Sequence, residues 1–95
     1  MRRSLTFMAV QRERLAKGLA RISGMSVFPS QANFLLAELP PRYSGQMLTR
    51  ALRRQGLLIR DCSAVPGLSG RTIRIAVRRP NENSRLLAAL RKIIV

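Results

Sequence analysis

Two arginines stand out by their positions in the sequence. Arg60 follows the apolar run Leu57–Ile59, and Arg74 lies between Ile73 and Ile75. An arginine in mid-strand is unusual, because its charge is rarely buried without a partner. A guanidinium group binds a carboxylate or a phosphate through two parallel hydrogen bonds. If both side chains reach one cleft, they form a site for a substrate with two anionic groups. Strand alternation alone slightly favours the alternative, in which Arg74 faces solvent on the open side of a sheet.

The rest of the sequence offers little catalytic chemistry. It contains no histidine, and its four carboxylates are scattered along the chain without forming a pair. Cys62 has no base near it in the sequence, and neither Lys17 nor Lys92 lies where a Schiff base is expected. With one cysteine and no histidine, structural zinc lacks ligands, and no phosphate-binding loop is present. We therefore expect no catalytic residue and no metal site in this chain.

The charge of the chain is strongly unbalanced, with 18 basic residues, 4 acidic residues and a net charge of +14. Such a chain attracts polyanions whatever its function, so a basic nucleic-acid-binding module is the alternative from another functional class. The few aromatic residues form no base-stacking pair on a strand, and the basic residues are spread over the whole chain. These patterns argue against a nucleic acid partner, and an arginine-rich coding preference also accounts for the charge.

The length of 95 residues fits a single domain with one modest core. No apolar run approaches the ~18 residues of a membrane span, so we expect no membrane partner. The apolar part of residues 1–10 ends before Gln11 and is too short for a signal peptide. A single cysteine excludes a disulfide scaffold. We expect a cytoplasmic protein.

Hydrophobic periodicity predicts three helices and four strands. The helices are expected over residues 5–22, 44–54 and from 80 to near the C-terminus, and the strands over residues 25–28, 33–37, 57–60 and 72–77. Ser44 is a plausible N-cap, Gly56 a stop, and Pro80 a first-turn residue. In the last strand, Ile73, Ile75 and Val77 face one way, and Thr72, Arg74 and Ala76 the other.

The predicted order of elements is α-β-β-α-β-β-α. The connections at residues 28–33 and 59–72 contain no helix, so consecutive strands there pair antiparallel or lie apart. We therefore predict an α+β fold, with a small, mainly antiparallel sheet and helices packed on it.

Six segments of the chain carry a family resemblance, in order and at matching spacing. They are Val27–Leu36 (VFPSQANFLL), Gly56–Ser63 (GLLIRDCS), Pro66–Leu68 (PGL), Ile73–Arg78 (IRIAVR), Pro80–Asn83 (PNEN) and Leu86–Leu90 (LLAAL). Together they resemble the C-terminal small domain of histidinol-phosphate-aminotransferase-like enzymes. These are pyridoxal-phosphate enzymes of the class I/II aminotransferase superfamily. Within that group, the Arg-Asp-Cys loop and the Ala-Val-Arg segment look most like the threonine-phosphate decarboxylases of cobalamin synthesis.

The resemblance implies roles for three residues. It assigns Arg74 to the substrate carboxylate and Arg60 to the substrate phosphate, and it places Asn33 near the substrate. Arg78 and Cys62 become loop or support residues. The implied substrate is a small molecule with a carboxylate and a phosphate, such as threonine phosphate, which is decarboxylated to aminopropanol phosphate. A histidinol-phosphate aminotransferase is the alternative within the family.

The cofactor of these enzymes is bound by a large domain whose lysine, aspartate and phosphate cup are absent from this sequence. We therefore expect residues 1–95 to form the C-terminal small domain alone, inactive by itself. A homodimer is expected only for the full-length parent. A small regulatory domain that binds amino acids or their phosphates through the same arginines is a third interpretation.

Overall fold

The computed structural model describes residues 2–30 and 32–94, with side chains from residue 7 onward in these ranges. The elements are α1 (Arg2–Ala20), β1 (Ser26–Val27), β2 (Phe34–Glu38), α2 (Gly45–Arg53), β3 (Arg60–Asp61), β4 (Thr72–Ala76) and α3 (Pro80–Ile93). This is the predicted order, and the α+β class is confirmed. None of the helices in these ranges is long and apolar enough to cross a membrane.

The four strands form one sheet in the order β1-β2-β4-β3, and every neighbouring pair is antiparallel. The two five-residue strands, β2 and β4, lie at the centre, and a two-residue strand lies at each edge. The prediction of antiparallel pairing is therefore confirmed, and it holds for the whole sheet.

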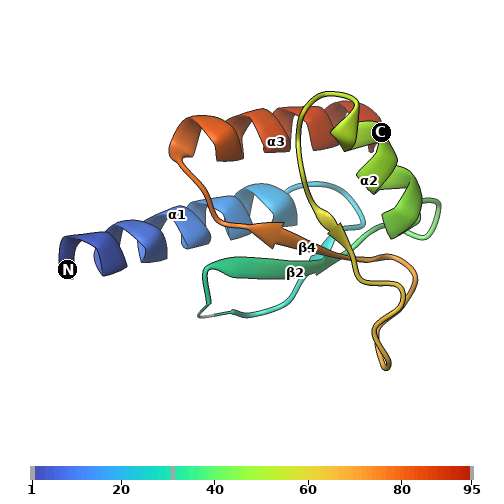
Figure 1. Ribbon diagram of the computed structural model, residues 1–95, viewed down its shortest axis with the longest axis horizontal. Helices are drawn as coiled ribbons and strands as arrows, with labels where there is room; N and C mark the ends of the chain where they lie inside the picture. The colour runs from blue at the N-terminus through green and yellow to red at the C-terminus, as the bar shows by residue number, and fades with distance from the viewer. Residues whose placement is uncertain (1, 31, 95) are drawn as a thin grey trace.

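One face of the sheet is buried under helices and the other is open. In β4, Ile73 and Ile75 are buried, as is Val77 just beyond it, whereas Arg74 and Ala76 are exposed. Figure 1 shows α1 and α3 on one side of the central strands. The alternation predicted for this strand is confirmed except at Thr72. Alternation places Thr72 on the open face with Arg74, but its side chain is buried.

The helix signals in the sequence act as predicted at most positions. The Ser44 hydroxyl accepts a hydrogen bond from the Met47 amide at 3.1 Å, which is the expected N-cap of α2. Pro80 occupies the first turn of α3. Leu48 and Leu52 of α2 are fully buried, but the apolar Met47 next to Leu48 is 48% exposed. Not every apolar residue of α2 therefore faces the core.

The strand expected over residues 57–60 is wrong in its position, since β3 comprises Arg60 and Asp61. The cause is the end of α2. The Leu57 amide donates to the Leu52 carbonyl and the Gly56 amide to the Arg53 carbonyl, both at 3.0 Å, and Gly56 has a φ of +76°. This Schellman arrangement reverses the chain and keeps Leu57 tied to the helix, so strand pairing starts three residues later.

Candidate anion-binding site

Arg60 and Arg74 are brought together by the pairing of β3 with β4. They are register partners, directly opposite each other in the antiparallel ladder. Side chains of opposite residues in such a pair project from the same face of the sheet. Both residues are exposed, and Arg74 lies on the open face. The two interpretations of Arg74, a solvent-facing residue and a partner of Arg60 in an anion site, are therefore compatible, because both arginines project from the open face.

The ring of Phe34 holds the side chain of Arg74. The guanidinium carbon of Arg74 lies 4.2 Å from the centroid of that ring. Phe34 is two residues before Leu36, which is the register partner of Arg74, so it reaches Arg74 diagonally on the same face. Contacts of this kind contribute about 0.5–1 kcal/mol at exposed sites, which restrains an otherwise mobile side chain.

A groove of about 590 Å³ opens beside these two arginines. Arg60 and Asp61 of β3, Arg74 of β4, and Thr49 and Arg53 of α2 are among its lining residues. The groove exists because β3 pairs with β4 at two positions only, and the chain before Arg60 runs free of the ladder.

The electrostatic character of the groove is positive. The carboxylate of Asp61 is engaged by its own loop, accepting from the Ser63 amide at 3.0 Å and the Ser63 hydroxyl at 2.9 Å. Within the part of the chain that the structure describes, no carboxylate forms an ion pair with Arg53, Arg60 or Arg74. Such a cluster of guanidinium groups is suited to binding an anion.

Asn33, the third residue expected at the site, does not line this groove. It is exposed and directly precedes β2, where its carbonyl accepts from the Val77 amide at 2.9 Å. Cys62 is buried, with Sγ 4.0 Å from the Arg60 carbonyl oxygen, in a position that supports the loop after β3.

Sequence reasoning missed Arg53 and Thr49 as groove residues. Arg53 is one of three arginines near the end of α2, with Arg50 and Arg54, and nothing in its type or spacing separates it from them. The sequence does not specify the direction of the chain after Gly56, and this direction brings β3 back beside α2.

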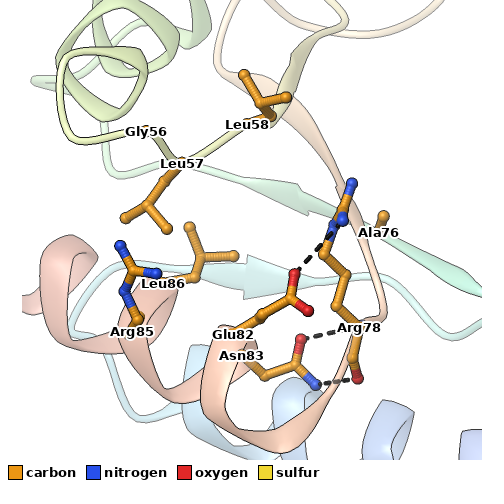
Figure 2. Close-up of a pocket in the computed structure, with 9 residues that line it drawn as sticks. All are labelled: Gly56, Leu57, Leu58, Ala76, Arg78, Glu82, Asn83, Arg85 and Leu86. Atoms are coloured by element: carbon orange, nitrogen blue, oxygen red, sulfur yellow. Dashed lines mark hydrogen bonds and ion pairs between the residues drawn. The ribbon is translucent and has the colours of Figure 1, made fainter.

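A second, smaller cavity of about 120 Å³ adjoins the groove and shares Leu58, Ala76 and Arg78 with it. Figure 2 shows the side chain of Asn83 against the backbone of Arg78, where it accepts from the amide at 3.0 Å and donates to the carbonyl at 2.9 Å. Arg78 also pairs with Glu82 at 3.4 Å. These contacts fix the turn from β4 into α3, which agrees with a supporting role for Arg78.

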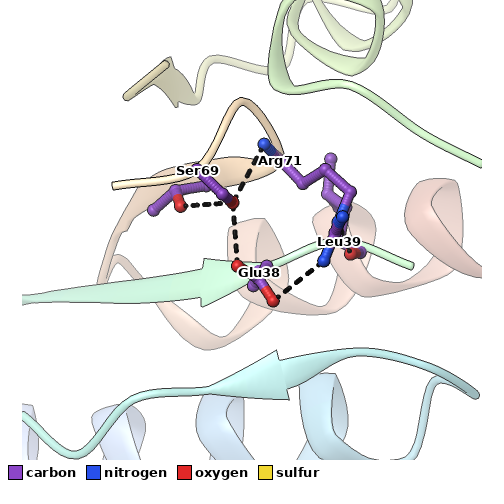
Figure 3. Close-up of polar contacts among 5 residues, drawn as sticks. Glu38, Leu39, Ser69 and Arg71 are labelled. Atoms are coloured by element: carbon purple, nitrogen blue, oxygen red, sulfur yellow. Dashed lines mark hydrogen bonds and ion pairs between the residues drawn. The ribbon is translucent and has the colours of Figure 1, made fainter. Parts of the chain in front are cut away.

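A polar cluster closes the opposite end of the central strands. Figure 3 shows the Ser69 hydroxyl donating to Glu38 at 2.8 Å, and Arg71 paired with the other Glu38 oxygen at 3.1 Å. Arg71 also donates to the Leu39 carbonyl at 3.1 Å. The hydrogen bond from Ser69, aided by the charge of Arg71, holds the pKa of the Glu38 carboxyl below its usual value of 4.5. The cluster thus ties the loop before β4 to the end of β2.

Replacing Glu38 with glutamine is expected to remove a pH-dependent part of the stability. Because folding lowers the pKa of this carboxyl, the ionised group stabilises the fold above pH 4.5, and the contribution is lost as the pH falls through the lower folded pKa. Urea titrations across this range are expected to show a steeper acid loss of unfolding free energy in the wild type than in E38Q. Solvent screening keeps the effect small.

The exposed residue Glu13 provides the matched control. Glu13→Gln removes the same charge from α1, and its acid loss of stability is expected to follow that of the wild type. If E38Q and E13Q gave the same profile, the polar cluster would contribute nothing specific.

Comparison with known proteins extends these observations. The sequence pattern of the family described as aminotransferase class I and II matches residues 1–90. The chain is 39% identical over 83 residues to histidinol-phosphate aminotransferase 2 of Bordetella parapertussis. This match covers 87% of this chain and 23% of that protein. It is 40% identical over 81 residues to the threonine-phosphate decarboxylase of Salmonella typhimurium, covering 85% of this chain and 21% of that protein.

The fold is similar to part of a solved structure, the L-threonine-O-3-phosphate decarboxylase of Porphyromonas gingivalis. The TM-score is 0.87 at 28% identity, and the match covers 93% of this chain and 27% of that one. The chain spans about a quarter of the length of the curated relatives it matches. On the family match over residues 1–90, this chain belongs to the class I and II aminotransferase family.

Proposed function

We propose that this chain is the substrate-binding small domain of a pyridoxal-phosphate-dependent enzyme acting on a phosphorylated amino acid. Enzymes of this family depend on pyridoxal phosphate in general. The observation that carries the proposal is the register pairing of Arg60 with Arg74 beside the groove. In this proposal Arg74 binds the carboxylate of the substrate, Arg60 binds its phosphate, and Asn33 lies near the substrate.

Threonine phosphate is the proposed substrate, and the parent activity is its decarboxylation. Threonine phosphate carries one carboxylate and one phosphate, so each of the two arginines has an anionic partner. Histidinol phosphate carries a phosphate but no carboxylate. A histidinol-phosphate aminotransferase, the second candidate, would use Arg74 for the amino acid that exchanges its amino group. Several relatives bear that name, which keeps it as the alternative.

The described residues do not form a site for pyridoxal phosphate. Enzymes hold this cofactor through a lysine Schiff base, and the chain has two lysines, Lys17 and Lys92. Both are exposed on helices, and neither lines the groove. The contribution of this chain is therefore limited to binding and orientation. Anchoring the carboxylate and the phosphate at two fixed points fixes the direction of the bonds at the substrate carbon between them.

Titration of the ¹⁵N-labelled 95-residue chain tests the proposal. Arginine side-chain signals are followed by NMR as O-phosphothreonine, histidinol phosphate or threonine is added. Both phosphorylated compounds are expected to shift the Arg60 signal, and O-phosphothreonine and threonine to shift that of Arg74. Equal binding of O-phosphothreonine and threonine would contradict the proposal.

The genomic DNA upstream of Met1 provides a second test. An uninterrupted reading frame that encodes a cofactor-binding lysine would support a small domain of a larger enzyme. A stop codon directly upstream would overturn it and favour a separate anion-binding domain.

A further inference from the structure

We propose that Arg53 of α2 and Arg60 of β3 together hold the phosphate of the substrate, leaving Arg74 to hold the carboxylate. This inference rests on the proposed function and adds a residue to it. The resemblance to known enzymes gives the phosphate a single arginine, Arg60. The structure brings a second one to the same groove from a different element.

The fold explains why Arg53 reaches this groove. Thr49 and Arg53 are four residues apart on α2, and residues at this spacing share a helix face. Both line the groove, whereas Arg50 and Arg54 line a separate depression. The turn at Gly56 then returns the chain to Arg60.

The order of the strands assigns Arg53 to the phosphate rather than to the carboxylate. β3 is the edge strand of the sheet, next to β4, and α2 packs against β3. β3, which carries Arg60, is therefore flanked by α2, which carries Arg53, and by β4, which carries Arg74. An anion at Arg60 can be reached from Arg53, while Arg74 is held on the far side by the Phe34 ring.

The charges of the groove favour a ligand with more than one negative charge. Four arginines line the groove. Arg78 pairs with Glu82, and no carboxylate among the described residues pairs with Arg53, Arg60 or Arg74. Like charges in one groove repel each other until a ligand neutralises them. A phosphate ester carries nearly two negative charges near neutral pH and offers three acceptor oxygens, so it accommodates two arginines where a carboxylate is satisfied by one.

Substitution of Arg53 tests the inference on the 95-residue chain. Affinities for O-phosphothreonine and threonine are measured by NMR titration for the wild type and for Arg53→Gln. Loss of one charge-assisted interaction is expected to weaken O-phosphothreonine binding about 10-fold and to leave threonine binding unchanged. Arg53→Lys keeps the charge but not the forked geometry, and it is expected to recover part of the loss.

Arg54→Gln is the matched control, because it removes the same charge from the next residue, outside the groove. Far-UV circular dichroism confirms that each variant is folded. If R53Q and R54Q weaken O-phosphothreonine binding equally, the role of Arg53 is overturned and the proposed function stands. If the wild type fails to prefer O-phosphothreonine over threonine, the proposed function fails, and the role of Arg53 fails with it.

Discussion

Arg74→Gln is expected to weaken the binding of O-phosphothreonine about 100-fold, because two charge-assisted hydrogen bonds of roughly 1.5 kcal/mol each are lost. The guanidinium is already restrained by the Phe34 ring at 4.2 Å, so little ordering opposes binding. Glutamine retains a polar side chain on the open face but cannot form the charged fork. The dissociation constant is measured by NMR titration of the wild-type chain and the variant.

Phosphoethanolamine, which has a phosphate and an amino group but no carboxylate, separates the role of Arg74 from general charge. Its affinity is expected to be the same in R74Q as in Arg91→Gln, a variant that removes an exposed arginine of α3 outside the groove. If R74Q weakened both ligands to the same extent, Arg74 would act through overall charge rather than through the carboxylate.

Leu90→Ala is expected to lower the free energy of unfolding by about 3 kcal/mol. Leu90 lies on α3, is 0% exposed and belongs to the apolar core between the helices and the sheet. Its truncation removes buried apolar contacts and leaves a cavity. For a domain of this size the loss is a large share of the total stability. Urea unfolding followed by far-UV circular dichroism measures it.

Leu58 provides the control for this truncation, since the same residue type is 66% exposed there. Leu58→Ala is expected to change the free energy of unfolding by less than about 0.5 kcal/mol. Similar losses in L90A and L58A would show that α3 is not packed as the structure describes it.

Most of the fold was predictable because its signals are local. The Ser44 cap, Pro80 at the start of α3 and the alternation around Ile73 and Ile75 depend on residues close together in the sequence. The strand before Arg60 was misplaced because its apolar residues fit either a strand or an extended connection. The hydrogen bond from the Leu57 amide back to the Leu52 carbonyl, at the end of α2, selects the extended connection.

The site was predictable only in part, for a related reason. Arg74 stands out in the sequence because isoleucines flank it, and Arg60 because it ends an apolar run. Their meeting on one face depends on the register of β3 against β4, which no local pattern specifies. No sequence feature distinguishes Arg53, because the helix dipole favours an arginine in the last turn of a helix whichever way its side chain points.

The short edge strands have a consequence for the behaviour of the chain in solution. β1 and β3 contribute two residues each, whereas the inner strands contribute five. A neighbouring molecule can extend a sheet only by pairing with an exposed edge, and a two-residue edge offers few free backbone groups. We therefore expect this chain to resist the growth of intermolecular β-sheets, even though one face of its sheet is not covered by helices.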